Sequence, residues 1–438
     1  MGKKIITLLA FLAFFNARSQ TTYFPPLSGS TWSTVSPASL GWCQDQLGTL
    51  IDYLGSRNTK AFIILKDGKI ALEKYYGTFT QDSVWYWASA GKTLTAFTVG
   101  IAQQEGLLSI NDTTSDYLNT GWTSCPASKE DLITIRHQLT MTSGLDDGVP
   151  DYTCTIDTCL QYLADAGTRW AYHNGPYTLL DGVIQSATGQ TLNSYFSQKI
   201  GSQTGMTGSY FPSGYNNVFF SKPRSMARFG LLVLNKGIWN GNSILSDTAY
   251  FNQMVNTSQL LNPSYGYLWW LNGKSSFRLP TLQTVFPGSL NPSAPDDMFA
   301  AVGKNGQLIN IVPSQNLVFI RMGNSPGTGG AVPVAFNDTI WQKLNTVFCN
   351  ASSVSDAIID ERDLKVYPNP ALQMVTIEMS KQIFDLQITD LAGRIIFENK
   401  HIWQKLEIDI QKFGTGIYLA HVLTNNKATY TKKIVVLR

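Results

Sequence analysis

The stretch Trp87-Ala88-Ser89-Ala90-Gly91-Lys92-Thr93-Leu94 places a serine three residues before a lysine, at the start of a run with helical composition. If Ser89 opens this helix, Lys92 lies one turn further along on the same face, where its amine reaches the serine hydroxyl. A serine needs such a base to become a nucleophile, and a lysine serves when burial or a nearby cation lowers its pKa. The free N–H groups of a helix start also stabilise oxyanions. Because this spacing is common by chance and more often marks an ordinary helix start, the other motifs have to decide between the two interpretations.

The N-terminus predicts export. Lys3 and Lys4 precede an apolar run from Ile5 to Phe15, and small residues around Ala17 suit a cleavage site. This pattern is typical of a secretory signal peptide and is too short to span a bilayer. We therefore assign residues 1–20 to a signal peptide.

Five cysteines follow, and disulfides persist in the compartments that an exported protein enters. Cys154 and Cys159 are close together in a polar loop, which predicts a local disulfide. Cys43 and Cys349 lie on two apolar helical patterns at opposite ends of one domain and pair only if those ends meet. Cys125 is the expected free thiol, because an odd count leaves one cysteine over.

Charge and histidine content argue against several classes of function. The formal net charge is +3 and no basic run occurs, so nucleic acid is not an expected partner. Only His137 and His173 precede residue 349, and no H-E-x-x-H occurs, so neither a metal nor another cofactor is expected. Tyr86 stands where a phosphate-binding loop ending at Gly91-Lys92-Thr93 would need its first glycine.

Hydrophobic patterns before residue 349 predict strands at both ends of a domain and helices between them. A helix is expected from Ser36-Pro37, with proline at its first position. Two apolar runs flank Asp67-Gly68 and predict a hairpin with a two-residue turn. Further strands are expected over 265–270, 298–302, 308–312 and 317–322, and a closing helix over 336–348. This order indicates an α+β fold: an antiparallel sheet built from both termini, with an inserted helical subdomain.

The amino-acid composition and the hydrophobic pattern change after residue 349. Residues 350–363 are polar and serine-rich, as in a linker. Residues 364–438 contain short apolar runs separated by turn signals, and they predict a small all-β sandwich. We therefore expect a catalytic domain over residues 21–349, a linker and a C-terminal domain.

Three loops carry the candidate chemistry: Ser89-x-x-Lys92, Tyr172-His173-Asn174 and Lys304-Asn305-Gly306. Their type and order resemble the serine hydrolases related to class C β-lactamases, which include esterases, amidases and D-alanyl-D-alanine carboxypeptidases. The resemblance covers about residues 40–348. It implies a β-lactamase-like sheet with helices on both faces.

The resemblance also implies a role for each matching residue. Ser89 would form an acyl-enzyme, with Lys92 and Tyr172 as the base system. Asn174 would hold Lys92 or the substrate amide, and Lys304 would supply a second cation. The backbone N–H groups of Ser89 and Gln307 would form the oxyanion hole, and the substrate-binding residues would be Trp87, Asn305 and Gly306.

The tail resembles a type IX secretion sorting domain, on the basis of Val366-Tyr367-Pro368-Asn369-Pro370, Asp390-Leu391-Ala392-Gly393-Arg394, Gly416-Ile417-Tyr418 and the basic pair Lys432-Lys433. Such a domain implies transport across the outer membrane by the type IX machinery, to the cell surface or medium. A carbohydrate-binding or spacer sandwich is the other interpretation.

Together these features predict an exported, monomeric serine hydrolase that acts on a small ester or amide. A β-lactamase or D-alanyl-D-alanine carboxypeptidase is the alternative within the same chemistry. A non-catalytic binding protein with a retained pocket is the alternative from another class. The aromatics Trp85, Trp87, Tyr265, Tyr267, Trp269 and Trp270 either line a pocket for an apolar acyl group or belong to the core.

Overall fold

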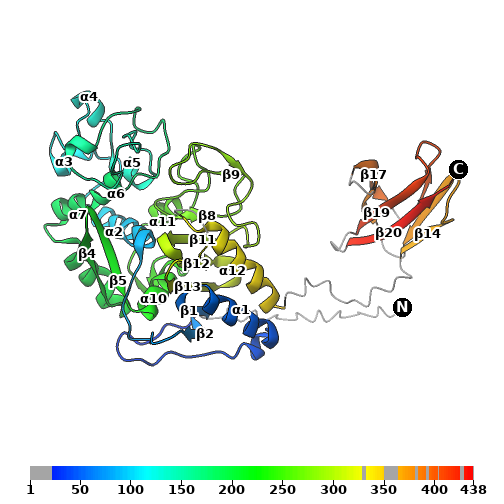
Figure 1. Cartoon of the computed structure of the whole chain (residues 1–438), viewed down its shortest axis with the longest axis horizontal. Helices are drawn as coiled ribbons and strands as arrows, with labels where there is room; N and C mark the ends of the chain where they lie inside the picture. The colour runs from blue at the N-terminus through cyan, green and yellow to red at the C-terminus, as the bar shows by residue number, and fades with distance from the viewer. Residues whose placement is uncertain are drawn as a thin grey trace, which may run out of the picture. The chain divides into compact units, whose positions relative to one another are not determined.

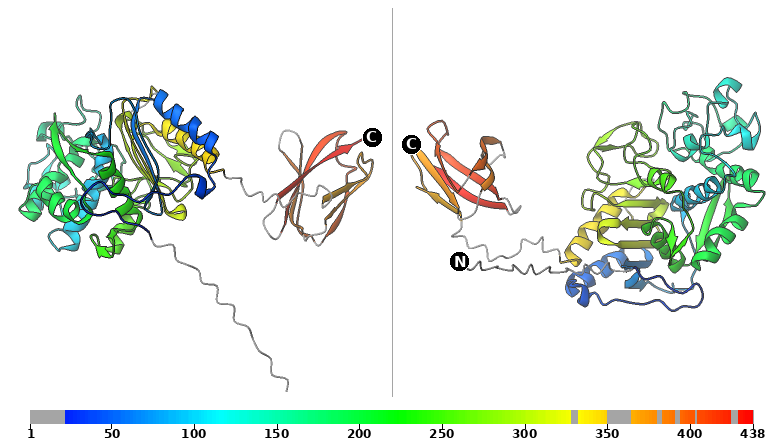
Figure 2. Two further views of the ribbon diagram at one scale, coloured as in Figure 1. Left: turned by 90° about the horizontal axis from the view of Figure 1, so that it is seen from below. Right: turned by 180° about the vertical axis from the view of Figure 1, so that it is seen from behind.

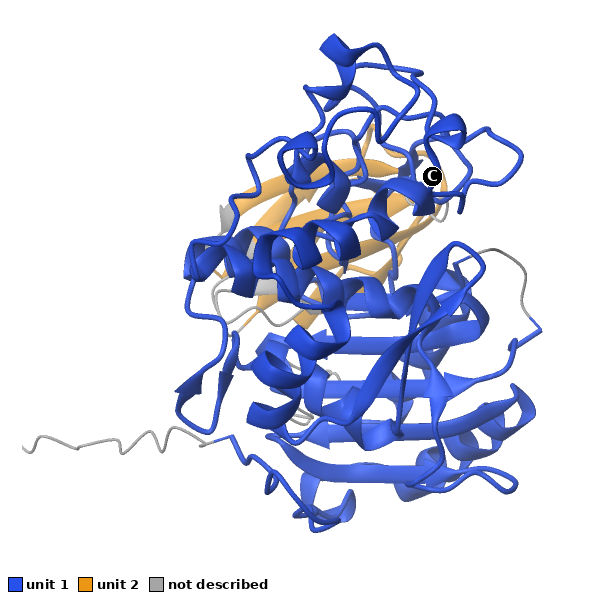
Figure 3. Cartoon of the chain, turned by 90° about the vertical axis from the view of Figure 1, so that its left-hand side faces the viewer, with its two compact units in different colours: residues 1–348 blue, residues 349–438 orange. Residues whose placement is uncertain are grey.

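The computed structural model describes residues 22–327, 332–349, 364–379, 383–390, 394–402, 404–424 and 429–437. The chain forms two compact units, residues 1–348 and 349–438, coloured separately in Figure 3. The predicted signal peptide and the predicted linker lie outside the described residues. Within the described part of the chain, no helix is both long and apolar enough to cross a membrane.

An antiparallel sheet of six strands organises the first unit, in the order β2-β1-β13-β12-β11-β8 (Figure 1). The strands are β1 (Thr59–Lys66), β2 (Lys69–Tyr75), β8 (Trp270–Leu271), β11 (Phe299–Gly303), β12 (Gln307–Val312) and β13 (Leu317–Gly323). Because β1 pairs with β13, the sheet joins the two ends of the unit, as the hydrophobic pattern predicts. Asp67 and Gly68 both have positive φ angles, 53° and 78°, as a two-residue hairpin turn between β1 and β2 requires.

Helices cover both faces of this sheet (Figure 2). On one face, α1 (Gln44–Ser56) packs beside α12 (Val334–Val347). On the other, α10 (Pro223–Leu234) lies against β1, β12 and β13, and α2 (Lys92–Gln104) runs through the centre of the unit. Every residue of α2 from Lys92 to Ala102 is buried, including the lysine and three threonines, which agrees with apolar residues on all sides of this helix.

Shorter elements complete the unit. They are β3 (Trp85–Tyr86), α3 (Ser115–Leu118), α4 (Ala127–Glu130), α5 (Ile135–Leu139), α6 (Asn174–Thr178), α7 (Leu180–Thr188), α8 (Leu192–Phe196), α9 (Ser202–Thr204), β4 (Gly208–Ser213), β5 (Asn216–Ser221), β6 (Ile238–Trp239), β7 (Asn242–Ser243), α11 (Thr248–Met254), β9 (Ser276–Phe277) and β10 (Phe286–Pro287). A small sheet in the order β3-β5-β4 places β3 just before the Ser89 turn. Thr134 caps α5 in a capping box with His137.

Two predicted elements differ from those observed. The helix expected from Ser36-Pro37 is only a 3₁₀ turn at Ala38–Leu40, because Gly41 is left-handed (φ 74°) and separates it from α1. The aromatic strand expected over 265–270 is reduced to Trp270–Leu271, because Leu268 has a φ of 61° that no strand accommodates.

The second unit is a sandwich of two antiparallel sheets, β14-β15-β18 and β17-β16-β19-β20. Its strands are β14 (Leu364–Tyr367), β15 (Met374–Met379), β16 (Ile383–Asp390), β17 (Ile395–Ile402), β18 (Lys405–Asp409), β19 (Gly416–Thr424) and β20 (Thr429–Val436). Buried apolar side chains from both sheets, such as Ile377, Leu386 and Ile434, form its core. The predicted all-β tail is therefore confirmed.

Candidate active site

Ser89 lies in a 3₁₀ turn (Ala88–Gly91) that leads directly into α2. Lys92 is the first residue of α2, and its Nζ donates a 2.9 Å hydrogen bond to Ser89 Oγ. Ala88 has a φ of 48°, a strained value for a residue with a side chain. Strain of this kind persists only where surrounding packing imposes it and is common at functional sites. The serine and lysine of the opening motif thus meet as the spacing predicts.

The environment of Lys92 favours the neutral amine. Its side chain is buried, with only 3% of the residue exposed. Burial lowers the pKa of Lys92 to about 7. Its amine lies 5.1 Å from the ring centroid of Tyr172 and 4.3 Å from that of Tyr177. These two rings attract the ammonium form and so oppose the effect of burial in part. The lowered pKa therefore makes the neutral amine, which can accept a proton, accessible near neutral pH.

Tyr172 directly precedes His173, the N-cap residue of α6, and its phenol interacts with the Ser89 hydroxyl. The ring stacks on Trp270 with a centroid distance of 5.8 Å, which joins the site to the edge strand β8. Burial raises the pKa of Tyr172 above its ordinary value, and the Ser89 hydroxyl only partly opposes that shift. The phenol therefore stays protonated at neutral pH, and Lys92 is the better base of the two.

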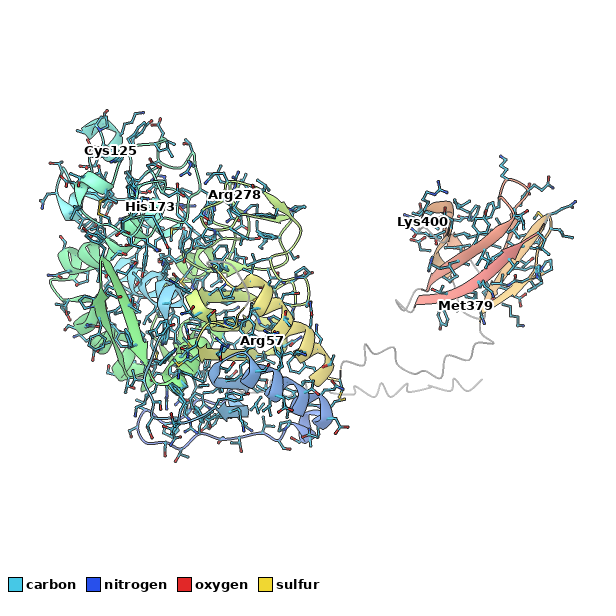
Figure 4. The ribbon with its side chains drawn as sticks, in the orientation of Figure 1. Arg57, Cys125, His173, Arg278, Met379 and Lys400 are labelled. Atoms are coloured by element: carbon cyan, nitrogen blue, oxygen red, sulfur yellow. A yellow bond between two sulfur atoms is a disulfide. The ribbon has the colours of Figure 1, made fainter. Side chains whose placement is uncertain are left out.

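Asn174 begins α6 and faces the same cavity as Ser89. Its Oδ1 is buried and has no hydrogen-bond partner within the described residues. His173, labelled in Figure 4, is also buried, and burial lowers its pKa to about 4. His173 is therefore neutral, whereas Asn174 offers an unused acceptor beside the nucleophile.

The turn between β11 and β12 forms another side of the site. A side chain on Gly303 would place its Cβ 2.5 Å from the Trp87 carbonyl oxygen and 2.9 Å from the Ala90 nitrogen. Gly303 thus allows the strand to lie directly against the serine turn. Lys304 follows it, is exposed and lines the cavity. Gln307 pairs with Gly303 across the turn.

The other residues predicted in this turn do not line the cavity. Asn305 is half-buried and donates a 2.7 Å hydrogen bond to the Tyr86 hydroxyl. A Cβ on Gly306 would lie 2.7 Å from Arg321 Nη1, which explains the glycine there, and its predicted contact with substrate stays a prediction. Gln307 is fully buried, and its side chain bonds to the backbone of Gly323. Its backbone N–H as an oxyanion donor stays a prediction.

Arg321, on β13, fixes this turn from behind. The fully buried guanidinium donates to the carbonyl oxygens of Asn305 and Gly306, at 2.9 and 2.8 Å. It also donates to the Arg57 carbonyl and the Thr59 hydroxyl. Burial lowers the pKa of Arg321 to about 9. Because all these acceptors are neutral, the charge holds backbone groups in place and does not form an ion pair.

These elements enclose a cavity of about 550 Å³ above Ser89. Four predicted residues besides the serine line it: Lys92, Tyr172, Asn174 and Lys304. The remaining lining residues are Tyr86, Ala88, Tyr152, Thr153, Tyr177, Ser213, Asn216, Asn217, Val218, Phe220, Pro280, Thr281 and Val332. Among the described residues, the lining holds two lysines and no carboxylate, and the volume of the cavity suits a small organic ligand.

Comparison with known proteins identifies the family of this chain. The profile of the beta-lactamase family matches residues 49–337, which is more than half of the chain. The chain belongs to the beta-lactamase family. Residues 365–437 match the secretion system C-terminal sorting domain, so the protein is exported to the cell surface or medium through type IX secretion.

Individual relatives of this beta-lactamase-family protein are distant. An uncharacterized protein of Alkalihalophilus pseudofirmus is 27% identical over 326 residues, covering 66% of this chain and 88% of the relative. A putative 6-aminohexanoate-dimer hydrolase from Bacillus anthracis has a TM-score of 0.55 at 18% identity, covering 74% of this chain and 89% of its own. A putative beta-lactamase from Bacteroides dorei has a TM-score of 0.56 at 17% identity, covering 70% and 99%. The structural likeness shows the fold.

The sequence of this beta-lactamase-family protein left open whether its aromatic residues line a pocket or belong to the core, and most of them belong to the core. Trp87, predicted to bind substrate, is fully buried, donates a 2.8 Å hydrogen bond to Ser221 Oγ and does not line the cavity. Tyr265, Tyr267, Trp269 and Trp270 are also core residues. The cavity is lined instead by Tyr86, Tyr152, Tyr177 and Phe220, which sequence reasoning missed. No periodic signal distinguishes them, because they come from four separate segments.

The predicted disulfide between Cys154 and Cys159 is present, with Cα atoms 5.9 Å apart. Cys125 is a free thiol, as expected. Cys43 and Cys349 are also disulfide-bonded, which agrees with their predicted pairing in a chain of five cysteines. No group of histidine, cysteine and carboxylate side chains in the described part of the chain could hold a metal ion.

Proposed function

We propose that this protein is a serine hydrolase that cleaves a small ester or amide through an acyl-enzyme on Ser89. The observation that carries the proposal is the 2.9 Å contact between Ser89 Oγ and the buried amine of Lys92, whose pKa burial lowers to about 7. A base with a pKa near the working pH is unprotonated in many molecules and still binds a proton strongly enough to take it from the serine. The beta-lactamase family, whose members hydrolyse ester and amide bonds, supports the same chemistry.

In the proposed reaction, neutral Lys92 takes the Ser89 proton as Oγ bonds to the carbonyl carbon. The oxyanion is stabilised by the Ser89 N–H and by a backbone N–H of the Gly303–Gln307 turn. As the carbon–leaving-group bond breaks, the proton passes from Lys92 through the Tyr172 hydroxyl to the leaving oxygen or nitrogen. Water then attacks the acyl carbon and gives a proton to Lys92. The bond between the acyl carbon and Ser89 Oγ breaks, Lys92 returns the proton to Oγ, and the acid leaves.

An amide group in the substrate fits this site. Asn174 Oδ1 is a buried acceptor that has no donor among the described residues, and an unsatisfied buried acceptor is costly. A substrate N–H beside the scissile bond would satisfy it. The printed name of one structural neighbour, a putative 6-aminohexanoate-dimer hydrolase, also describes an amide substrate. Lys304, exposed on the cavity wall, would contact an anionic group of the substrate.

The decisive experiment compares the parent protein with Ser89→Ala. The parent should hydrolyse at least one member of a panel of acyl esters, D-amino-acid peptides and nitrocefin, and a fluorophosphonate should label it. Ser89→Ala should lose both activities while keeping the melting temperature of the parent. Equal hydrolysis by the two proteins would reject the mechanism. A parent that is neither labelled nor active would instead be a binding protein.

A further inference from the structure

A disulfide-bonded loop forms one wall of the cavity. Tyr152 and Thr153 line the cavity, and Cys154, bonded to Cys159, follows them directly. This segment comes from the polar stretch between α5 and α6, about 20 residues before the Tyr172 motif in sequence. Sequence reasoning predicted the disulfide without assigning it any part in the site.

The loop is seated on the start of α6, the element that carries Asn174. The Gly175 N–H donates a 3.0 Å hydrogen bond to the Tyr152 carbonyl oxygen. A Cβ on Gly175 would lie 2.4 Å from the Cys154 carbonyl oxygen, so the two backbones are in direct contact. The Thr153 N–H and hydroxyl both donate to Asp151 Oδ1, at 2.9 and 2.5 Å, which shapes the turn.

The disulfide ties this segment to an anchored part of the fold. Cys159 is followed by Leu160, which is fully buried in a small core with Trp122, Ile133 and Leu145. The Leu160 carbonyl accepts a 3.1 Å hydrogen bond from the Ser124 N–H. Tyr152 and Thr153 belong to none of the hydrophobic cores of the described chain, whereas Cys154, the next residue, is only 1% exposed. The disulfide, the burial of Cys154 and the Gly175 contact together therefore hold these two residues in place.

Tyr152 presents an unused aromatic surface to a ligand. It is 41% exposed, and its hydroxyl makes no hydrogen bond within the described residues. Its phenol lies near enough to Tyr172 to contribute to the raised pKa of that residue. Tyr86, Tyr177 and Phe220 line other parts of the cavity. An apolar group of aromatic size would be covered on several sides by such a lining.

We propose that Tyr152 and Thr153 determine which acyl group this cavity accepts, that they select an apolar acyl group of aromatic size, and that the Cys154–Cys159 disulfide holds them in place. The inference rests on the proposed hydrolase function of the same cavity. It assigns the disulfide to substrate selection, in addition to any effect on stability.

The test uses two substrates with one leaving group, 4-nitrophenyl acetate and 4-nitrophenyl phenylacetate, and follows the ratio of kcat/KM for phenylacetate over acetate. Tyr152→Ala should lower this ratio about tenfold, mainly through KM for phenylacetate, since it removes one wall of an apolar pocket. The double variant Cys154→Ser/Cys159→Ser should lower it in the same direction, by about threefold or more. Melting temperatures establish that each variant is folded at the assay temperature.

Two control variants show whether the change in the ratio comes from the cavity wall or from the loss of any exposed tyrosine or any thiol. Tyr215, also 41% exposed, lies in the β4–β5 turn and does not line the cavity, so Tyr215→Ala should leave the ratio unchanged. Cys125→Ser controls for the loss of a thiol. A ratio within about twofold of the parent in Tyr152→Ala overturns the proposal. If the ratio changes in Tyr152→Ala but not in the double serine variant, the disulfide has no part in substrate selection. A parent inactive on both esters counts against the proposed function.

Discussion

Lys92 places an amine with a pKa of about 7 against the serine hydroxyl, and this sets an expected pH dependence. Only the neutral amine accepts the serine proton, so kcat/KM should rise with pH and level off above about pH 7. Below that value it should fall about tenfold per pH unit. A pH profile of kcat/KM from pH 5 to 9 on a neutral ester measures this fall at low pH, the acid limb of the profile.

The half-buried carboxyl of Asp181 has a pKa raised into the same range, so the pH profile needs a control for it. Burial raises the pKa of Asp181 to about 7, and Asp181 accepts a 2.9 Å hydrogen bond from Asn217, which lines the cavity. Asp181→Asn should keep the acid limb if Lys92 causes it. If the limb disappears in Asp181→Asn, the base has been wrongly assigned.

Asn174 should discriminate between substrates with and without an N–H beside the scissile bond. Its buried Oδ1 has no partner within the described residues, so Asn174→Ala should not lower the melting temperature. It should lower kcat/KM for an amide-bearing ester by about threefold to tenfold, the value of one neutral hydrogen bond, and leave the ester lacking that N–H less affected. Equal losses on both substrates would assign Asn174 to orienting Lys92 instead.

At the scale of elements, the close contact between β11 and the serine turn leaves no room for one added carbon atom. Gly303→Ala should push the strand away, because its Cβ would lie 2.5 Å from the Trp87 carbonyl oxygen. A misplacement of about 1 Å in a catalytic site can cost about a hundredfold, so kcat should fall by at least about tenfold. Steady-state kinetics on one ester would measure the loss.

Gly48→Ala is the matched control for that substitution. Gly48 lies within α1, and no atom lies within 4 Å of a Cβ built there. Alanine should therefore raise the free energy of unfolding by about 0.5–1 kcal/mol and leave kcat unchanged. Comparable activity in Gly303→Ala and Gly48→Ala would show that the turn is not constrained by this contact.

At the scale of the whole molecule, all candidate catalytic residues lie in the first unit, and the sorting domain forms a unit with its own core. A chain ending at Asp363 should therefore fold and keep kcat/KM within about twofold of the full-length protein. In a host with the type IX apparatus it should accumulate in the periplasm, because only the signal for the first membrane crossing remains. Assays of medium, surface and periplasm for both chains test this, and normal secretion of the shorter chain would contradict it.

Local sequence determined much of this protein by itself. The Ser89-x-x-Lys92 contact follows from helical spacing, the 59–75 hairpin from Asp67-Gly68, and the tail strands from period-two runs between turns. The disulfide between Cys154 and Cys159 was likewise predictable, because the two residues are only 5 positions apart. In each case the interacting groups are close along the chain, so spacing and turn chemistry specify them.

Only the tertiary structure decided which residues surround the reacting atoms. Trp87 belongs to the core, and Tyr86, Tyr152, Tyr177 and Phe220 form the cavity wall, although nothing in their local sequence distinguishes the two groups. Gly303, and not Gly306, makes the close approach to the serine turn, because register between distant segments sets that distance. The same holds for the pKa of Lys92: burial by residues from distant segments lowers it, and desolvation depends on the completed fold.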